Sequence, residues 1–244
     1  MKALAVVFDF VIFLGRSLAL PWDVRRTFPR IAEQVFYVGA GAVPIVVLAS
    51  VFVGLTTAVQ TSYQLLGIVP RYFIGMGVGR MLLIELGPVF CAFIFASRSA
   101  SAIAAELGAM RNSDQIDALK VMGIDPYRFL CLPRIVGAAV SLPILVVTME
   151  VIAALTAVVV SGLIGVAPET FVYGLTHFVQ TQDFIGGLIK AIIFGVSIAT
   201  SGCYFGFNAA GGARGLGKAT TRAVVVAGVL ILFFDFIVAV LMFS

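Results

Sequence analysis

Charged residues are scarce in this chain. Asp, Glu, Lys and Arg make up 11% of its 244 residues, and hydrophobic residues make up 61%. A soluble globular domain has about 25% charged and about 45–50% apolar residues. So few charges cannot cover a surface that faces water, which excludes a soluble globular protein. The composition predicts an integral membrane protein.

Groups that bind metals or perform catalysis are scarce as well. The three cysteines, Cys91, Cys131 and Cys203, lie far apart and form no Cys-x-x-Cys pair, which favours buried small hydrophobic residues over disulfides or ligands. His177 is the only histidine, and no cysteine lies near it. No nucleophile stands at a sensible spacing from an acid–base pair. We therefore expect no catalytic residue, no metal site and no cofactor bound by this chain.

Five apolar segments are long enough to cross a bilayer core of about 30 Å at about 1.5 Å per residue. They cover, approximately, residues 38–59, 72–96, 135–164, 185–205 and 223–243. We expect them to form one all-α membrane domain over residues 38–244.

The segment Ala3–Leu20 is apolar too, but we expect it to lie in the membrane interface. Lys2, Asp9 and Arg16 recur every seven residues and therefore share one helical face. A polar stripe of this kind faces water in interfacial helices. A proline and several basic residues follow. Residues 1–37 are therefore predicted to form an interfacial amphipathic helix and a solvated basic connection.

Lysine and arginine are concentrated in alternate loops. Of the sixteen, five precede the first span, five lie in the loop 97–134, and three (Arg214, Lys218 and Arg222) precede the last span. Cytoplasmic loops carry an excess of these residues. The pattern predicts a cytoplasmic N-terminus and an external C-terminus, and it favours a bacterial inner membrane over a plastid one. Because the charge follows the loops, the net charge of +4 does not indicate nucleic-acid binding.

Five ionisable residues stand inside the predicted spans: Arg80, Glu85, Glu150, Lys190 and Asp235. A charge at the bilayer centre costs about 2.5–3.5 kcal/mol on insertion scales, so such residues usually face a bundle interior or a wet cavity and mark a pathway. Arg80 and Glu85 lie about 140° apart around an α-helix and are not expected to pair with each other. We expect Lys190 to pair with Glu85 or Asp235. The pairs either hold the bundle together or line a transport path, and five such groups in one small bundle favour the path.

The loop 97–134 is the one sizeable polar region. Residues 113–120 form the pattern of a short amphipathic helix, with Asp114 and Asp117 in the first turn and Lys120 in the last, which suits the helix dipole. A cytoplasmic helix of this kind either docks into a groove on a soluble partner and transmits its motion, or lies inert on the surface. Periodicity alone leaves both interpretations open.

Glycine-containing patterns in the chain do not indicate nucleotide binding. Gly212–Ala219 approaches GxxxxGK[ST], but it lacks the hydroxyl that would hold Mg²⁺ and follows a membrane span rather than a strand. We expect a flexible cytoplasmic turn there. Gly75 with Gly79, and Gly202 with Gly206, lie four residues apart in apolar helices and favour close packing of helix backbones.

Several of these segments together resemble a known family. Glu85-Leu-Gly-Pro88 and the run Ala96–Arg111 are similar to the core signature of the MlaE/YrbE permeases, which are membrane subunits of ABC transporters that move phospholipids or other lipids with MCE-domain partners. The similarity continues at Asp125-Pro126, Pro133-Arg134, Ser141-Leu-Pro143, 183–190, 219–222 and 235–243. It covers nearly the whole chain from about Phe28 onward.

The resemblance implies an interfacial helix plus five spans, working as a homodimer with a lipid cavity between the subunits. A cytoplasmic ABC ATPase dimer would bind ATP and Mg²⁺, and an external oligomer of MCE-domain proteins would exchange the lipid. Glu85, Lys190 and Asp235 match intramembrane positions of the family, to which the energetic argument adds Arg80 and Glu150. The residues implied to couple to the ATPase, in and around a loop helix at 106–120, are Glu106, Leu107, Met110, Arg111, Asp114, Gln115, Asp117 and Lys120. Those implied to contact lipid are Gln60, Leu65, Leu66 and Ile68.

The chain departs from the family at two places. Family members often carry Arg immediately before the residue matching Glu85, where this chain has Ile84, and Arg80 is the available substitute. The segment 60–68 also differs from the family pattern. Two other functions stay open: a proton-coupled secondary transporter of a hydrophobic substrate, disfavoured by the absence of an evident inverted repeat, and a lipid-modifying membrane enzyme.

Overall fold

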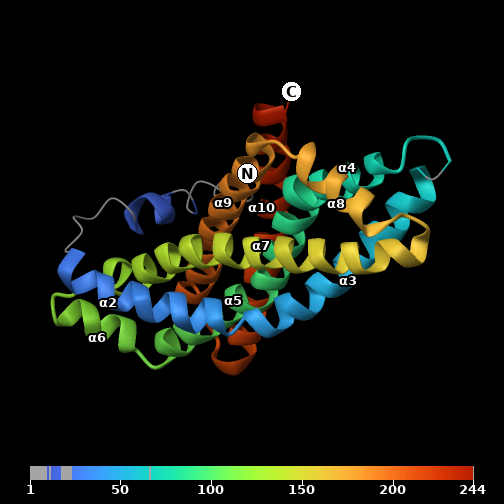
Figure 1. Cartoon of the computed structure of the whole chain (residues 1–244). Helices are drawn as coiled ribbons and strands as arrows, with labels where there is room; N and C mark the ends of the chain where they lie inside the picture. Colours follow the sequence, from blue (N-terminus) through green and yellow to red (C-terminus); the bar gives the residue numbers. More distant parts are fainter. Residues whose placement is uncertain (1–9, 11, 18–23, 66, 244) are drawn as a thin grey trace. The chain divides into compact units, whose positions relative to one another are not determined.

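The computed structural model describes residue 10 and residues 12–17, 24–65 and 67–243. These residues form helices and turns and no β-strand. In chain order the helices are α2 (Val24–Gln34), η1 (Val35–Ala40), α3 (Val43–Leu65), α4 (Tyr72–Met81), η2 (Leu82–Leu86), α5 (Gly87–Asn112), α6 (Gln115–Val121), η3 (Tyr127–Cys131), α7 (Leu132–Ser161), η4 (Gly162–Ile164), α8 (Pro168–His177), α9 (Thr181–Phe207) and α10 (Gly212–Phe243) (Figure 1). The first three η segments are π-helical, and η4 is a 3₁₀ turn.

Five helical segments of the described residues are long and apolar enough to cross a membrane. They are Val43–Leu65, Tyr72–Asn112, Tyr127–Ile164, Thr181–Phe207 and Gly212–Met242. The predicted all-α fold and the count of five candidate spans are confirmed. Two of the segments are much longer than the roughly 20 residues that a bilayer core requires, because helix continues into the polar loop 97–134 from both sides.

The predicted interfacial helix at the N-terminus can be compared with the structure at only a few residues. Of the expected interfacial helix, residues 10 and 12–17 are helical, and the remainder of 3–20 lies outside the described residues. From Val24 onward the predicted basic connection is helical, since α2 and η1 continue to Ala40, and its solvation stays a prediction. α2 is strongly amphipathic, as is typical of a helix with one face packed and one face exposed.

The first and last spans also have boundaries that differ from the prediction. α3 starts at Val43 and ends at Leu65, so it includes the polar residues that were expected to follow the first span. α10 starts at Gly212 rather than near Ala223. The flexible turn expected at Gly212–Ala219 is therefore wrong. Helix formation is cooperative, and the long apolar run after Ala223 extends helix back through the glycines.

The chain divides into two compact units, each assembled from three stretches of sequence. The first unit comprises residues up to Gly41, Phe95–Ser141 and Ile193–Phe234. The second comprises Ala42–Ile94, Leu142–Ile192 and the residues from Asp235 onward. Helices α5, α7, α9 and α10 each contribute residues to both units.

In the first unit, α5 and α9 pack closely because α9 carries small residues at the contact. A Cβ at Gly202 would lie 2.9 Å from Ile103 Cβ, and one at Gly206 would lie 2.8 Å from Leu107 Cβ. The predicted packing role of these two glycines is confirmed. Two of the cysteines, Cys131 and Cys203, lie in this unit, and all three cysteines are free and buried as expected.

In the second unit, the apolar core joins α3, α4, α7 and α8. It includes Ala58, Ile74, Ala153 and Phe171. Figure 1 shows α4 and α8 side by side. A Cβ at Gly75 would overlap the carbonyl of Phe171, and a Cβ at Gly174 would overlap that of Tyr72. The two backbones thus meet at paired glycines.

Helix α8 lies between the third and fourth predicted spans, where the sequence analysis assigned no helix. Pro168 at its first turn suits a helix start. His177 ends the helix, and its ring stacks on Tyr173 with centroids 4.7 Å apart. The imidazole of His177 thus packs on an aromatic neighbour at the end of α8. The rings of Tyr72 and Phe178 stack nearby, with centroids 5.6 Å apart.

The packing of α4 against α8 yields a stability prediction. Gly174→Ala introduces a methyl group against the Tyr72 carbonyl, and we expect it to destabilise the fold by about 1–3 kcal/mol. Gly217→Ala, in α10 where an added Cβ would have nothing within 4 Å, is the matched control and should be neutral or stabilising by up to about 1 kcal/mol. Chemical unfolding in mixed micelles measures both. Equal effects of the two substitutions would contradict close α4–α8 packing.

Candidate functional site

Lys190 is the centre of an ion cluster inside the second unit. Its side chain is fully buried, with 0% exposure. Nζ donates to Glu85 Oε1 at 2.8 Å and to the carbonyl oxygen of Ile84 at 3.0 Å. Asp235 Oδ1 also lies 2.8 Å from Nζ, outside hydrogen-bond geometry, so it acts as a charge contact. The structure therefore joins the predicted residues Glu85, Lys190 and Asp235, and Lys190 pairs with both carboxylates.

The Ile84 carbonyl is available to Lys190 because of Pro88. An α-helical carbonyl accepts from the N–H four residues later, and Pro88 has no N–H to donate to Ile84. The local backbone is the π-helical turn η2, closed by the Gly87 N–H to the Leu82 carbonyl. Single π-helical turns are frequent at functional sites. The motif Glu85-Leu-Gly-Pro88 thus supplies a carboxylate and a free carbonyl to one ammonium.

Arg80 has a different partner, Asp183 at the start of α9. Arg80 Nη2 donates to Asp183 Oδ1 at 3.1 Å, and the Asp183 side chain is 1% exposed. Asp183 Oδ2 accepts from the backbone N–H of Gln180 at 3.1 Å. Arg80 and Glu85 do not pair with each other, as expected. Both nevertheless reach α9, because the wider turn η2 lies between them.

Asp183 is a site residue that sequence reasoning missed. A signal for it exists in the spacing, since Asp183 and Lys190 are seven residues apart and therefore share a face of α9. Their partners Arg80 and Glu85 follow each other on the neighbouring segment in the same order. A search for charges of opposite sign at matching positions of two spans would have found the pair.

Glu150 is separate from these ion pairs. It lies on α7 with 5% exposure, and no hydrogen bond or ion pair of its carboxylate occurs among the described residues. Its side chain lies against two glycines: a Cβ at Gly87 would lie 2.8 Å from Glu150 Cγ, and one at Gly187 would lie 3.5 Å from Oε1. The structure therefore places it near the cluster without joining it.

The residues expected to contact lipid do not form one group. Gln60 lies beside Thr56, Val59 and Tyr63 along a hollow of about 460 Å³ on α3. Leu65 instead packs against the core of the second unit. Ile68 is 78% exposed in the turn after α3. Leu66 lies outside the described residues. Their contact with lipid stays a prediction.

The polar loop contains the predicted short helix as α6, preceded by the last turn of α5. Glu106, Leu107, Met110 and Arg111 belong to α5, whereas Gln115, Asp117 and Lys120 belong to α6. The expected single helix at 106–120 is therefore wrong. The break falls at Asp114, whose φ of 56° is left-handed, a conformation that Asp tolerates better than most residues.

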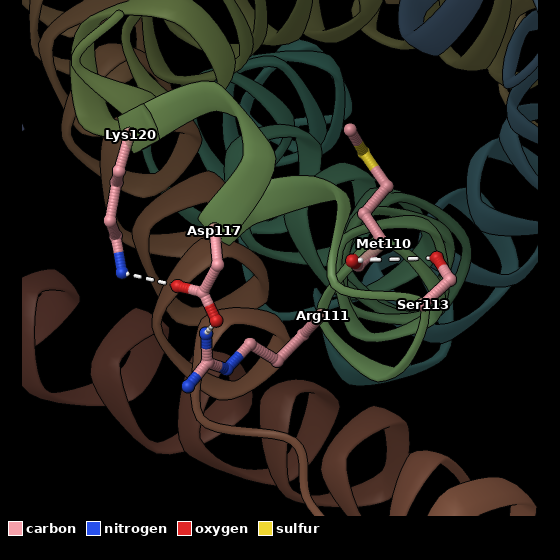
Figure 2. Close-up of polar contacts among 5 residues, drawn as sticks. All are labelled: Met110, Arg111, Ser113, Asp117 and Lys120. Carbon is pink, nitrogen blue, oxygen red and sulfur yellow. Dashed lines mark hydrogen bonds and ion pairs between the residues drawn. The ribbon is translucent and has the colours of Figure 1, made fainter. Parts of the chain in front are cut away.

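Three charged residues form ion pairs within α6 and between α6 and the end of α5. Figure 2 shows Asp117 between Arg111 and Lys120, with Oδ2 2.7 Å from Arg111 Nη1 and Oδ1 2.7 Å from Lys120 Nζ. The hydrogen bond from Lys120, helped by the charges of both cations, lowers the pKa of Asp117 below its ordinary value of 3.8. The ion pairs of Asp117 therefore contribute to stability above pH 3.8, and this contribution is lost as the pH falls through the lowered pKa of Asp117.

Helix α6 rests on buried side chains and ends in a defined C-terminal cap. Leu107 and Ile116 are buried, and Glu106 Oε1 lies 2.7 Å from Nη2 of the buried Arg134. At the C-terminus, Gly123 has a φ of 74°, and the N–H groups of Gly123 and Ile124 donate to the carbonyls of Lys120 and Leu119. This is a Schellman motif. The outer face of α6, which includes Gln115 and Lys120, is exposed.

The metal-binding and nucleotide-binding patterns considered in the sequence can be compared with the described residues. Among the described residues, no group of three or more His, Cys, Asp or Glu side chains is placed to hold a metal. The glycine-rich segment at 212–219 is helical and so differs from a phosphate-binding loop. Two carboxylates share one ammonium at Lys190, and shared partners of this kind allow two alternative pairings.

Comparison with known proteins agrees with the family resemblance found in the sequence. The sequence model of a family described as permease MlaE matches residues 31–241. An intermembrane phospholipid transport system permease protein of Haemophilus influenzae is 31% identical over 98% of this chain and 95% of its own length. A probable ABC transporter permease protein of Synechocystis is 35% identical over 87% of this chain and 81% of its own. The chloroplast protein TRIGALACTOSYLDIACYLGLYCEROL 1 of Arabidopsis thaliana is 30% identical over 95% of this chain and 69% of its own.

The shared ammonium yields the second prediction. Lys190→Met leaves two carboxylates and the Ile84 carbonyl without their partner, and we expect a loss of about 3–5 kcal/mol in unfolding free energy. Combining it with Glu85→Gln removes one unpaired charge and should recover about 1–3 kcal/mol. Unfolding of the purified chain in mixed micelles gives both values. Strictly additive losses would show that Glu85 and Lys190 are not coupled.

Proposed function

The chain belongs to the MlaE permease family, and on that premise we propose that it is the membrane subunit of an ABC transporter that moves phospholipid or a related lipid. The names of its relatives as transport permeases support this function. The observation that carries it is the cluster at Lys190, fully buried between two carboxylates within apolar helices. Well-packed apolar residues often stabilise a protein interior at least as well as a buried ion cluster does. The presence of the cluster therefore favours a role in transport.

The lipid is proposed to move along the second unit. The hollow on α3 beside Gln60 and Tyr63 is built from a single helix, and neighbouring α3 residues Leu48 and Phe52 are more than half exposed. A second copy of the chain, packed against this face, would enclose a path for a lipid. The working form is therefore proposed to be a homodimer, with Glu85, Lys190 and Asp235 as the polar element beside that path and with Gln60 and Ile68 in contact with lipid.

Energy is proposed to enter through the loop 97–134. The helical segment Tyr72–Asn112 is continuous, and along the chain it connects Glu85 of the ion cluster with the turn before α6. A cytoplasmic ABC ATPase dimer, which would hold ATP and Mg²⁺, is proposed to dock on α6 and the adjoining end of α5. The chain itself would carry no ATPase site and no cofactor.

The proposed location is a bacterial inner membrane, with the N-terminus in the cytoplasm and the C-terminus outside. The alternation of basic loops supports this orientation. It puts α6 on the cytoplasmic side and α8 on the external side. On the external side, an oligomer of MCE-domain proteins is the proposed partner that receives or delivers the lipid.

The ion cluster provides a test of transport. We expect Glu85→Gln to lower ATP-driven lipid transfer in proteoliposomes about tenfold, the equivalent of about 1.4 kcal/mol of lost interaction, while the complex still assembles. Glu169→Gln, which alters an exposed acid on α8, should leave transfer unchanged. Full transfer by Glu85→Gln would contradict the proposed role. Transfer that needs a proton gradient but no ATPase would favour a secondary transporter instead.

The docking surface provides a separate test. Under mild detergent the chain should co-purify with an ABC ATPase, and Asp114→Asn should weaken that association about tenfold, because it removes a charge from the exposed turn before α6 and Asn also tolerates the left-handed backbone there. Glu33→Gln, an exposed acid on α2, is the control. Recovery of the chain without any ATPase, from cells that contain the whole complex, would refute the assignment of the energy source.

A further inference from the structure

The second unit contains a partly open apolar cavity of about 360 Å³, apart from the hollow on α3. Its walls come from η2, α7, α8 and the start of α9, with Leu83, Val151, Ala154, Val179 and Phe184 among the lining residues. The volume lies within the range of about 300–1,000 Å³ that ligand pockets occupy. Such pockets are mostly apolar and carry a few polar groups that orient the ligand.

Glu150 is the only ionisable residue in the lining of this cavity. It is 95% buried, being 5% exposed, and no donor or cation pairs with it among the described residues. A buried polar group costs free energy unless it is hydrogen-bonded, and an ionised one costs far more unless it is paired. The glycines at 87 and 187 leave room for this carboxyl group. An occupant of the cavity that brings a donor or a cation would complete the site.

The charges around Glu150 favour a cation. The neighbouring cluster has one ammonium, Lys190, for the two carboxylates of Glu85 and Asp235, while Arg80 is used by Asp183. Glu150 adds a third acid to that excess. Its link to the cluster is short, because Gly87 follows Glu85 by two residues and Gly187 precedes Lys190 by three. This part of the second unit therefore lacks positive charge.

We propose that the cavity binds an aminophospholipid, with one acyl chain against the apolar walls and the primary ammonium at Glu150. The ammonium supplies both the missing positive charge and N–H donors, and charge-assisted hydrogen bonds of this kind are stronger than neutral ones. The site rests on the proposed function only in that the protein handles lipids. It names the headgroup class that this chain selects.

The test is lipid retention by the purified full-length chain. Nanodiscs containing equal amounts of phosphatidylethanolamine and phosphatidylglycerol, each with a photoreactive acyl chain, are irradiated, and the cross-linked peptides are identified by mass spectrometry. We expect labelling of α7 residues 147–154 by phosphatidylethanolamine to exceed that by phosphatidylglycerol about tenfold, as for one hydrogen bond between charged groups. Equal labelling by the two lipids would overturn the proposal and leave a proton as the partner of Glu150.

Two variants separate the headgroup from the chain. Glu150→Gln should abolish the preference for phosphatidylethanolamine, and Ala154→Phe, which fills the cavity while keeping the acid, should lower labelling by both lipids at residues 147–154. Glu169→Gln is the matched control and should behave as the unaltered chain does. A preference that survives Glu150→Gln, or labelling that survives Ala154→Phe, would overturn the site.

The outcome is separable from that of the proposed function. Labelling needs neither the ATPase nor ATP, so a failed preference leaves ATP-driven transfer to be measured by itself. Conversely, absence of ATP-driven transfer with an intact preference would show a lipid site in a protein that is not an ABC permease subunit.

Discussion

The interior of a bilayer supplies no partner to a bare carbonyl, ammonium or carboxylate, and the second unit is arranged around that constraint. Pro88 has no N–H to donate to the Ile84 carbonyl, and the Lys190 ammonium donates to that carbonyl. The same ammonium neutralises Glu85 and contacts Asp235. Arg80 and Asp183 form a second ion pair between the same two helical segments. Each of these polar groups is thus stabilised by another from a distant part of the sequence.

Polar groups of the second unit that are not fully paired are the best candidates for a functional role. The Lys190 cluster has two acids for one base, and Glu150 has no partner among the described residues beside an apolar cavity. Incomplete neutralisation is unfavourable in a resting protein and useful in one that must bind and release. The second unit combines accessible apolar surface with an ammonium shared by two carboxylates, and the proposed lipid transport would use both features.

The first unit follows a different balance. The contacts around Asp117 are exposed, and exposed ion pairs contribute little to stability. The position of α6 depends instead on burial of Ile116 and Leu107 and on the Schellman motif at Gly123. A firmly seated helix with a polar outer face suits docking of a soluble partner, since the seat does not need to reorganise when the partner binds.

The sequence by itself determined the membrane class, the five spans, the free cysteines and the family, because hydrophobic runs, loop charges and local motifs are encoded within short windows. It also identified Glu85, Lys190 and Asp235 as intramembrane charges. Only the tertiary structure decided that one ammonium serves both acids, that Asp183 pairs with Arg80, that α8 packs on α4, and that Leu65 faces the core while Glu150 faces a cavity. Those features depend on which side chains from separate spans come within about 3 Å of each other. Helical periodicity fixes the face on which a side chain lies, but it does not fix the neighbour that the face meets.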